Sequence, residues 1–305
     1  MSDLATHHLY QIVEATMDYI EEHLKSNISL DALSSTLGLS KYHLHRLIKH
    51  TTGMPIMHYI RARKLSASVD YLLHTNWNII DIASEFGFLH EQTYIRSFKR
   101  QFGVTPSQLR KNFGQITLTE KFDLQRLGKV ADGLIFEPQF VVKPITYLAG
   151  RKGDVNLETN YLTHCANAAG NAFFYKEHPF IPNKVNPHLY IGLTVLNGNS
   201  PIAHYIPSTE VYDPEGLDAS WDITVLPAQK YIVFTFIGDF HPRYLTAVQL
   251  REIWSYMDHW LPQSLYMRCA PYFFEYIDTR LATEQYCEVD LYLPICSNQE
   301  GSLAR

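Results

Sequence analysis

The chain has 305 residues, 46% of them hydrophobic, and a formal net charge of −5. The length suggests two domains of ordinary size, and the composition is that of a globular protein, which excludes a wholly disordered chain. No run of 18 apolar residues occurs, so a membrane-spanning segment is excluded as well. Because the N-terminus lacks a basic start followed by an apolar stretch, we expect no secretory signal and a cytoplasmic protein.

Charge is distributed unevenly along the chain. Residues 40–112 contain 11 Lys and Arg against 4 Asp and Glu, whereas residues 113–305 contain 14 against 21. A basic segment joined to an acidic one indicates a nucleic-acid binder fused to a domain that does not touch nucleic acid, with ordinary scatter of surface charge as the alternative. The cysteines form no C-x-x-C pair, and in an intracellular protein we interpret them as free thiols rather than disulfides or a zinc site: Cys165, Cys269, Cys287 and Cys296.

In chain order, the first third of the sequence predicts helices. We expect a helix over residues 9–25, a second after Ser29, a recognition helix after Ser40 and a long helix over residues 56–74. The long helix would span roughly 28 Å, close to the ~34 Å of one DNA turn, so it suits a spacer between two successive major grooves. We expect its basic residues to lie near the DNA backbone: Arg61, Arg63 and Lys64.

This segment contains two imperfect copies of one pattern, at residues 33–49 and 82–99. The offset between the copies is 49 residues up to a shared glycine and 50 beyond it, which aligns Arg46 with Arg96. A helix, a glycine turn and a second amphipathic helix make a helix-turn-helix motif. Because chance rarely supplies the same spacing twice, the duplication favours a DNA-binding unit over a helical bundle with solvated basic faces.

Each recognition helix has an apolar and a polar face. The residues expected to face inward are Leu44, Leu47 and Ile48, then Ile95, Phe98 and Phe102. The candidate DNA-binding residues face outward: Tyr42, His45, Arg46 and Lys49, then Gln92, Thr93, Arg96 and Lys99. Arg donates two hydrogen bonds to guanine and Gln pairs with adenine, whereas Lys contacts phosphate without reading sequence.

The same segment resembles the AraC/XylS DNA-binding domain, and within it the MarA/Rob branch. The resemblance is carried by residues 40–47, 59–65, 81–88 and 98–110. It implies promoter DNA and RNA polymerase as partners, with base contacts from six of the outward residues: Tyr42, His45 and Arg46, then Gln92, Thr93 and Arg96. The branch usually has Trp and Gln where Tyr42 and His45 stand, and often Gln where Glu91 stands, so the resemblance carries over the DNA-binding class but not the operator sequence.

Beyond residue 112 the pattern changes. Residues 113–133 are weakly periodic and are interpreted as a linker. From residue 134 the pattern favours strands, and one order of elements occurs twice. The first set is a strand over 140–150, a helix over 156–175 and paired strands over 189–196 and 203–212; the second is 228–238, 244–261, 272–278 and 286–294. Two β-α-β-β repeats predict an α+β domain over residues 134–298, with a groove between the repeats.

We expect the groove to bind a ligand. A carboxylate among bulky rings is costly unless it faces a polar cleft or a cation, which singles out Glu275, with Glu288 as a second candidate. The candidate aromatic walls are Trp221, Tyr231, Phe234 and Trp254. The alternatives are that the aromatic residues form the core and that strand alternation points Glu275 to solvent.

This half resembles the GyrI-like effector-binding domain. The resemblance is carried by residues 226–234, 253–262, 274–276 and 288–295. It implies a receptor for small molecules, often hydrophobic cations held by a buried acid in an aromatic cleft, and Glu275 matches that acid. Some relatives of this domain are hydrolases.

The interpretation is therefore a multi-domain, ligand-responsive transcriptional regulator. An all-α domain with two helix-turn-helix motifs occupies residues 1–112, and the α+β domain follows the linker. No Ser-His-Asp order, metal triad or phosphate loop is visible, so we expect no enzyme, no catalytic residues, no metal and no cofactor. Two alternatives stay open for the second domain: a hydrolase with Glu275 as general base, and a module for drug sequestration or protein interaction.

Overall fold

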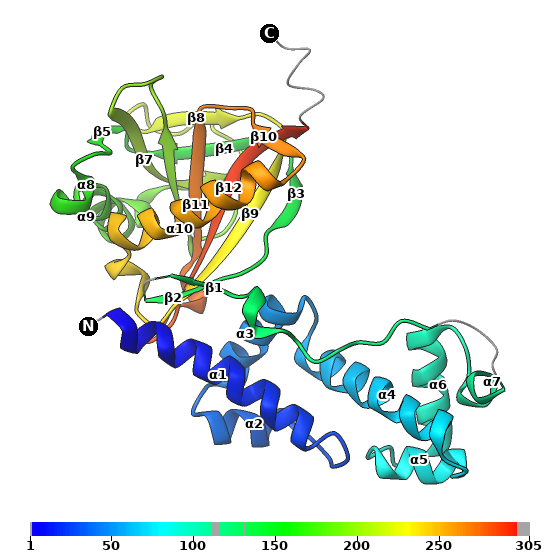
Figure 1. Ribbon diagram of the computed structural model, residues 1–305. Helices are drawn as coiled ribbons and strands as arrows, with labels where there is room; N and C mark the ends of the chain where they lie inside the picture. The colour runs from blue at the N-terminus through cyan, green and yellow to red at the C-terminus, as the bar shows by residue number, and fades with distance from the viewer. Residues whose placement is uncertain (1, 112–115, 131, 298–305) are drawn as a thin grey trace. The chain divides into compact units, whose positions relative to one another are not determined.

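The computed structural model describes residues 2–111, 116–130 and 132–297, and it divides into two compact units (Figure 1). One unit comprises residues 10–125, and the other comprises residues 126–305 together with residues 1–9. Within the expected linker and C-terminal boundary, residues 113–115, 131 and 298 lie outside the described residues. In the described part of the chain, no helix is long and apolar enough to cross a membrane.

The first unit is helical, as the sequence predicts. Its helices are α1 (Ser2–Glu22), α2 (Leu30–Leu37), α3 (Lys41–Thr52), α4 (Ile56–His74), α5 (Ile79–Glu85), α6 (Glu91–Phe102) and α7 (Pro106–Arg110). The expected bounds of α4 are confirmed, whereas α1 begins earlier than residue 9. The Ser29 and Ser40 side chains accept hydrogen bonds from backbone N–H groups in the first turns of α2 and α3, which confirms both as N-caps.

Helix α4 forms the centre of this unit. Its Leu65, Val69 and Leu72 pack into one core with Phe86 and Phe98 of the second motif. Helices α3, α5, α6 and α7 all contact α4. A helix surrounded in this way has little surface left for solvent, so its polar residues must find partners inside the protein.

The expectation that Arg63 and Lys64 lie near the DNA backbone is wrong. Their exposed fractions are 9% and 8%. Arg63 donates from Nε and Nη2 to both carboxylate oxygens of Glu21, at 2.7 Å each, and Lys64 Nζ donates to the backbone oxygens of Ser26 and Phe86. The physical reason is the central position of α4, which turns these basic side chains toward the interior instead of toward solvent.

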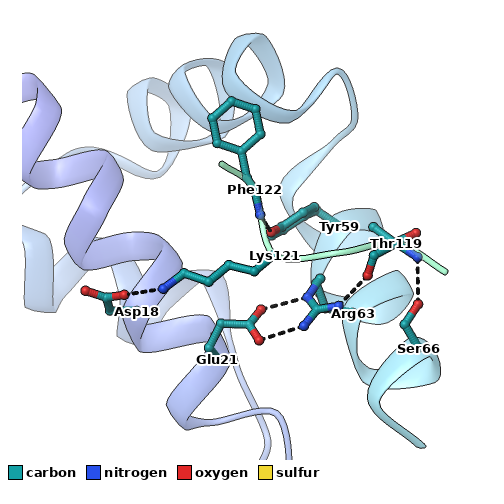
Figure 2. A network of polar contacts seen from close by, with 8 residues as sticks. All are labelled: Asp18, Glu21, Tyr59, Arg63, Ser66, Thr119, Lys121 and Phe122. Carbon is teal, nitrogen blue, oxygen red and sulfur yellow. Dashed lines mark hydrogen bonds and ion pairs between the residues drawn. The ribbon is translucent and has the colours of Figure 1, made fainter. Parts of the chain in front are cut away.

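Residues 116–123 run along α4 and are hydrogen-bonded to it (Figure 2). The backbone N–H of Thr119 donates to Ser66 Oγ at 2.9 Å, and the carbonyl of Thr119 accepts from Arg63. The backbone N–H of Phe122 donates to Tyr59 Oη at 2.9 Å. This part of the expected linker is thus packed against the helices as a strap, a term we keep for residues 116–123.

Among the described residues, the second unit is built on one twelve-stranded antiparallel sheet. Its strands are β1 (Gly128–Val130), β2 (Gly133–Ile135), β3 (Gln139–Lys143), β4 (Thr146–Gly150), β5 (Gly153–Asn156), β6 (Leu189–Val195), β7 (Ile202–Val211), β8 (Asp222–Leu226), β9 (Gln229–Gly238), β10 (Tyr266–Arg268), β11 (Tyr272–Asp278) and β12 (Cys287–Ser297). The order is β1-β2-β9-β12-β11-β6-β7-β4-β8, with β3 on β9, β5 on β7 and β10 on β12. The helices are α8 (Asn160–Thr163), α9 (Cys165–Ala172) and α10 (Ala247–Trp260).

Two expected elements differ in detail. The strand expected over residues 140–150 is divided into β3 and β4, because Pro144 has no N–H to continue a ladder. The helix expected over residues 156–175 is preceded by β5 and divided into α8 and α9 at His164, whose φ is +51°. The paired strands expected over residues 189–196 and 203–212 are confirmed as β6 and β7.

Both faces of the sheet carry buried side chains, and strand alternation decides which residues share a face. On β9, Ile232 and Phe234 belong to the core cluster that includes Ile253 of α10, which lies across the sheet in Figure 1. Tyr231 and Val233 belong to a different core cluster. Successive side chains of a strand point to opposite faces, so the two clusters lie on opposite sides of the sheet. We call them the α10 face and the distal face.

Candidate functional site

The outer face of α3 is polar and contiguous. Leu44, Leu47 and Ile48 are fully buried, as expected. Of the four candidate DNA-binding residues, Tyr42 and Lys49 are exposed, and His45 and Arg46 are half-buried. The guanidinium carbon of Arg46 lies 5.9 Å from the centre of the Tyr42 ring. Burial of one face therefore leaves an aromatic ring and a guanidinium together on the other.

Helix α6 likewise has one buried face and one exposed face, and its exposed face is more accessible than that of α3. Gln92, Thr93, Arg96 and Lys99 are all exposed. Arg96 Nε donates to the backbone oxygen of Gln92 at 3.3 Å, so the residues at the two positions lie one above the other on the same side of the helix.

The inner face of α6 differs from expectation at one position. Phe98 is fully buried and Ile95 and Phe102 are half-buried, but Tyr94 is fully buried too. Its hydroxyl shares a hydrogen bond with Ser68 Oγ at 2.9 Å, and burial raises the pKa of Tyr94 to about 12. The four-residue spacing of Tyr94 and Phe98 is the signal in the sequence that identifies this position.

The two recognition helices also end in the same way. Gly53 follows α3 with φ +74°, and its N–H donates to the Lys49 carbonyl at 2.9 Å. Gly103 follows α6 with φ +78°, and its N–H donates to the Lys99 carbonyl at 2.8 Å. Glycine adopts this left-handed backbone without the steric cost that a Cβ brings, so the glycines stop both helices at equivalent points.

In the second unit, Glu275 lies on the α10 face of the sheet. It is on β11, directly opposite Gly192 of β6, and its exposed fraction is 5%. A Cβ at residue 192 would collide with Glu275 Oε2, so the glycine leaves the space that the carboxylate occupies. Burial raises the pKa of Glu275 to about 8, opposed by a backbone hydrogen bond. The alternative that Glu275 points to solvent is therefore wrong.

Two tyrosines lie beside this carboxyl group. The hydroxyls of Tyr190 and Tyr205 share a hydrogen bond of 2.5 Å, and both residues line a cavity of about 80 Å³ with Glu275. Burial raises the pKa of both tyrosines, so they are neutral hydroxyl groups near pH 7. Gly170 of α9 makes room for the Tyr190 hydroxyl, since a Cβ there would overlap it.

A larger cavity of about 340 Å³ also has Glu275 and Tyr205 in its lining. This volume falls within the range that holds a drug-sized molecule. The lining combines rings with charged groups: Tyr161, Trp254 and Phe273, then Arg251, Asp258 and Arg268. Arg268 stands over Trp254 at 5.0 Å and Arg251 over Tyr161 at 5.6 Å. In the described part of the chain, no three His, Cys, Asp or Glu side chains are grouped to hold a metal ion.

Of the six expected ligand residues, Trp254 and Glu275 line the larger cavity and the other four lie elsewhere. Phe234 is packed in the core beneath α10, and Trp221 lies against Arg151, whose guanidinium carbon is 4.2 Å from the ring centre. Tyr231 and Glu288 point to the distal face. Glu288 is three residues from Leu291, the partner of Glu275, so alternation places the two acids on opposite sides of the sheet.

Other residues that line the cavities were not expected from the sequence: Asn160, Tyr190 and Tyr205, with Gly192 behind Glu275. The sequence did contain a signal for Gly192, because a glycine inside a predicted strand marks a close approach of another group.

The comparisons with known proteins match the helical part of the chain and the sheet-containing part to two different families. Residues 33–112 match a helix-turn-helix domain, and residues 137–295 match the GyrI-like small molecule binding domain. The chain is 42% identical over 237 residues to the right origin-binding protein of Escherichia coli (strain K12), which covers 74% of this chain and 78% of that protein. It is 29% identical over 238 residues to the transcriptional regulator Rob of Salmonella typhimurium, with the same coverage. The multiple antibiotic resistance protein MarA of Escherichia coli (strain K12) is 38% identical over 98 residues, 32% of this chain and 77% of that protein.

Proposed function

The chain belongs to the AraC-type family of DNA-binding transcriptional regulators with a GyrI-like small-molecule-binding domain, and from this premise we propose that it reads two adjacent major grooves of promoter DNA and senses a hydrophobic cation. RNA polymerase is the further partner that we propose. The observation that carries the DNA part is the pair of matched recognition helices, α3 and α6, in one compact unit.

The spacing supports reading by both helices. Helix α4 joins the two motifs and has 19 residues, which corresponds to roughly 28 Å. Half-sites on one face of DNA are separated by about 34 Å, so a single chain suits two successive grooves without dimerisation. In this proposal Arg46, Gln92 and Arg96 contact base edges, and Lys49 and Lys99 contact phosphates.

The observation that carries the ligand part is the buried carboxyl group of Glu275 in the lining of a drug-sized cavity. The ionised carboxylate has lost its hydration there, so it gains most from a cation that brings apolar surface and is desolvated with it. The rings of Tyr161, Trp254 and Phe273 supply apolar walls and cation–π attraction. We therefore propose a flat, apolar cation as the effector class.

A labelled DNA fragment and a matched ligand pair test the proposal. The full chain is titrated with the fragment alone, with N-methylacridinium, and with the uncharged acridine. We expect sequence-specific binding that the cation changes and the neutral analogue changes much less. Sequence-independent binding would contradict the DNA part, and equal effects of the two ligands would contradict the cation part.

Two experimental results would support the alternative functions of the second unit. Steady release of nitrophenol from a nitrophenyl ester, abolished by Glu275→Gln, would establish a hydrolase with Glu275 as general base. Tight cation binding with no effect on DNA affinity would instead support sequestration or an interaction module.

A further inference from the structure

Two of the four cysteines meet at one end of the sheet. All four are free thiols, as expected, with Cys165 and Cys269 exposed, Cys296 half-buried and Cys287 buried. Strand β10 pairs antiparallel with the end of β12, with Met267 opposite Cys296. Cys269 follows the last residue of β10, and its N–H donates to the Pro294 carbonyl at 3.2 Å, which continues the ladder.

The register places the two thiols on the same side of this ladder. Directly opposite residues of an antiparallel pair point to one face, so Cys296 shares a face with Met267. Cys269 is two residues beyond Met267 and therefore points to that face as well. Cys269 and Cys296 are thus diagonal neighbours, a relation in which side chains of adjacent strands reach each other.

The two side chains lie close together, because the Cys296 thiol acts on the pKa of Cys269. Gln229, the first residue of β9, donates from Nε2 to Cys269 Sγ at 2.9 Å and to the Ile295 carbonyl at 3.1 Å. The amide therefore holds the Cys269 sulfur beside the end of β12. Burial, together with Cys296, raises the pKa of Cys269 to about 11, so this group stays protonated near neutral pH.

We propose that Cys269 and Cys296 form a reversible intramolecular disulfide when the protein meets a hydroperoxide. The Cys296 sulfur attacks one peroxide oxygen, the O–O bond breaks, and Cys296 becomes a sulfenic acid while the other oxygen takes up the Cys296 thiol proton and leaves as water or an alcohol. The Cys269 sulfur then attacks the sulfenic sulfur, the S–O bond breaks, and the hydroxide takes up the Cys269 proton and leaves as water. Two thiols are oxidised by two electrons, and one peroxide is reduced.

The bond requires a movement of the local backbone. A disulfide requires Cβ atoms within about 4.5 Å of each other, closer than diagonal neighbours in a regular ladder. Strand β10 has three residues and pairs with β12 at the border of the sheet, so we expect its end to move the remaining distance when the bond forms. The bond would tie β10 to β12 next to Arg268, which lines the larger cavity, so oxidation would restrain one wall of that cavity.

Thiol counting on the full chain tests the proposal. The protein is treated with one equivalent of hydrogen peroxide, denatured in excess alkylating reagent and digested without reductant for mass spectrometry. We expect the alkylatable thiols to fall from four to two, with the peptides of Cys269 and Cys296 joined and dithiothreitol restoring all four. Cys165 is the internal control for general oxidation, because it is exposed but is not part of the proposed disulfide.

Two variants separate pairing from general oxidation. Cys269→Ser and Cys296→Ser each remove one sulfur with little change in size, and neither should give a joined peptide within one chain. Wild-type protein in which Cys269 and Cys296 are recovered separately, or in which disulfides join two chains through Cys165 or Cys269, would overturn the proposal. This readout uses the wild-type chain, so it stands even where a variant folds poorly.

Discussion

The carboxyl group of Glu275 occupies the space that a Cβ of residue 192 would fill. The two residues face each other across β11 and β6, at the central strand pair of the sheet. The acid is therefore buried without displacing a neighbouring side chain, because the strand opposite has none at this position. The lining of the larger cavity therefore rests on this pair as well as on its aromatic walls.

Gly192→Ala should consequently impair cation binding without any change of charge. The added methyl would also lie against the Tyr205 hydroxyl, so neither the carboxylate nor the tyrosine pair keeps its place. We expect a loss of N-methylacridinium affinity comparable to that of Glu275→Gln, measured by calorimetric titration. Gly153→Ala is the matched control, since its Cβ would meet only the Tyr205 carbonyl, at 4.0 Å. Unchanged affinity in Gly192→Ala would contradict the arrangement.

Stability should depend on pH through Glu275. The folded-state pKa is about 8 and the ordinary value is 4.5, so the folded chain binds this proton more tightly than the unfolded chain. The stability that the chain gains from binding this proton is fully present below about pH 4.5. It is lost as the pH rises to about 8, and the free energy of unfolding then falls by up to roughly 1.4 kcal/mol per pH unit. Urea unfolding of wild type and Glu275→Gln across this range is the measurement. A difference between the two proteins that stays constant with pH would refute it.

Cation binding should have the opposite dependence on pH. A cation binds the ionised form of Glu275, so affinity rises with pH and levels off above about 8. Near neutral pH, binding should release close to one proton per site. Calorimetry in buffers of different ionisation enthalpy measures that proton, and acridine should release none.

Base reading and phosphate binding should separate on α6. Arg96→Ala should cost about 1–3 kcal/mol on the selected operator and relax preference at one base pair. Lys99→Ala, one turn away on the same exposed helix, should weaken all sequences alike and lower the salt slope by about one unit. Gel-shift titrations at several salt concentrations distinguish them. If Arg96→Ala left operator affinity unchanged, α6 would not be a base reader.

The strap should contribute to the stability of the helical unit. A fragment of residues 1–112 loses the strap partners of Tyr59, Arg63 and Ser66, whereas a fragment of residues 1–125 retains them (Figure 2). We expect the longer fragment to be about 1–3 kcal/mol more stable in urea, with both binding DNA. In the full chain, Ser66→Ala removes one of these contacts and should have a smaller effect of the same sign. Equal stability of the two fragments would mean that the strap contacts α4 without stabilising the helical unit.

Much of the architecture follows from local patterns in the sequence. The duplicated spacing around Arg46 and Arg96 predicted both recognition helices, and the alternation of strands and helices after residue 134 predicted the α+β unit. Glu275 was recognisable as costly because it stands among rings. Such signals depend on residues a few positions apart, which is the range over which helical and strand periodicity operates.

The tertiary structure decided which of these residues meet. Arg63 and Lys64 are basic, as residues that contact DNA phosphates are, but the other helices surround α4 and turn both side chains to internal acceptors. Glu288 matches Glu275 as a buried acid, but the register of β12 on β11 places it on the distal face. The sequence by itself determined the elements, their faces and the chemistry available. Strand register and helix packing join residues far apart in the chain, and they alone decided that Glu275 lies with Gly192, Tyr190 and Tyr205.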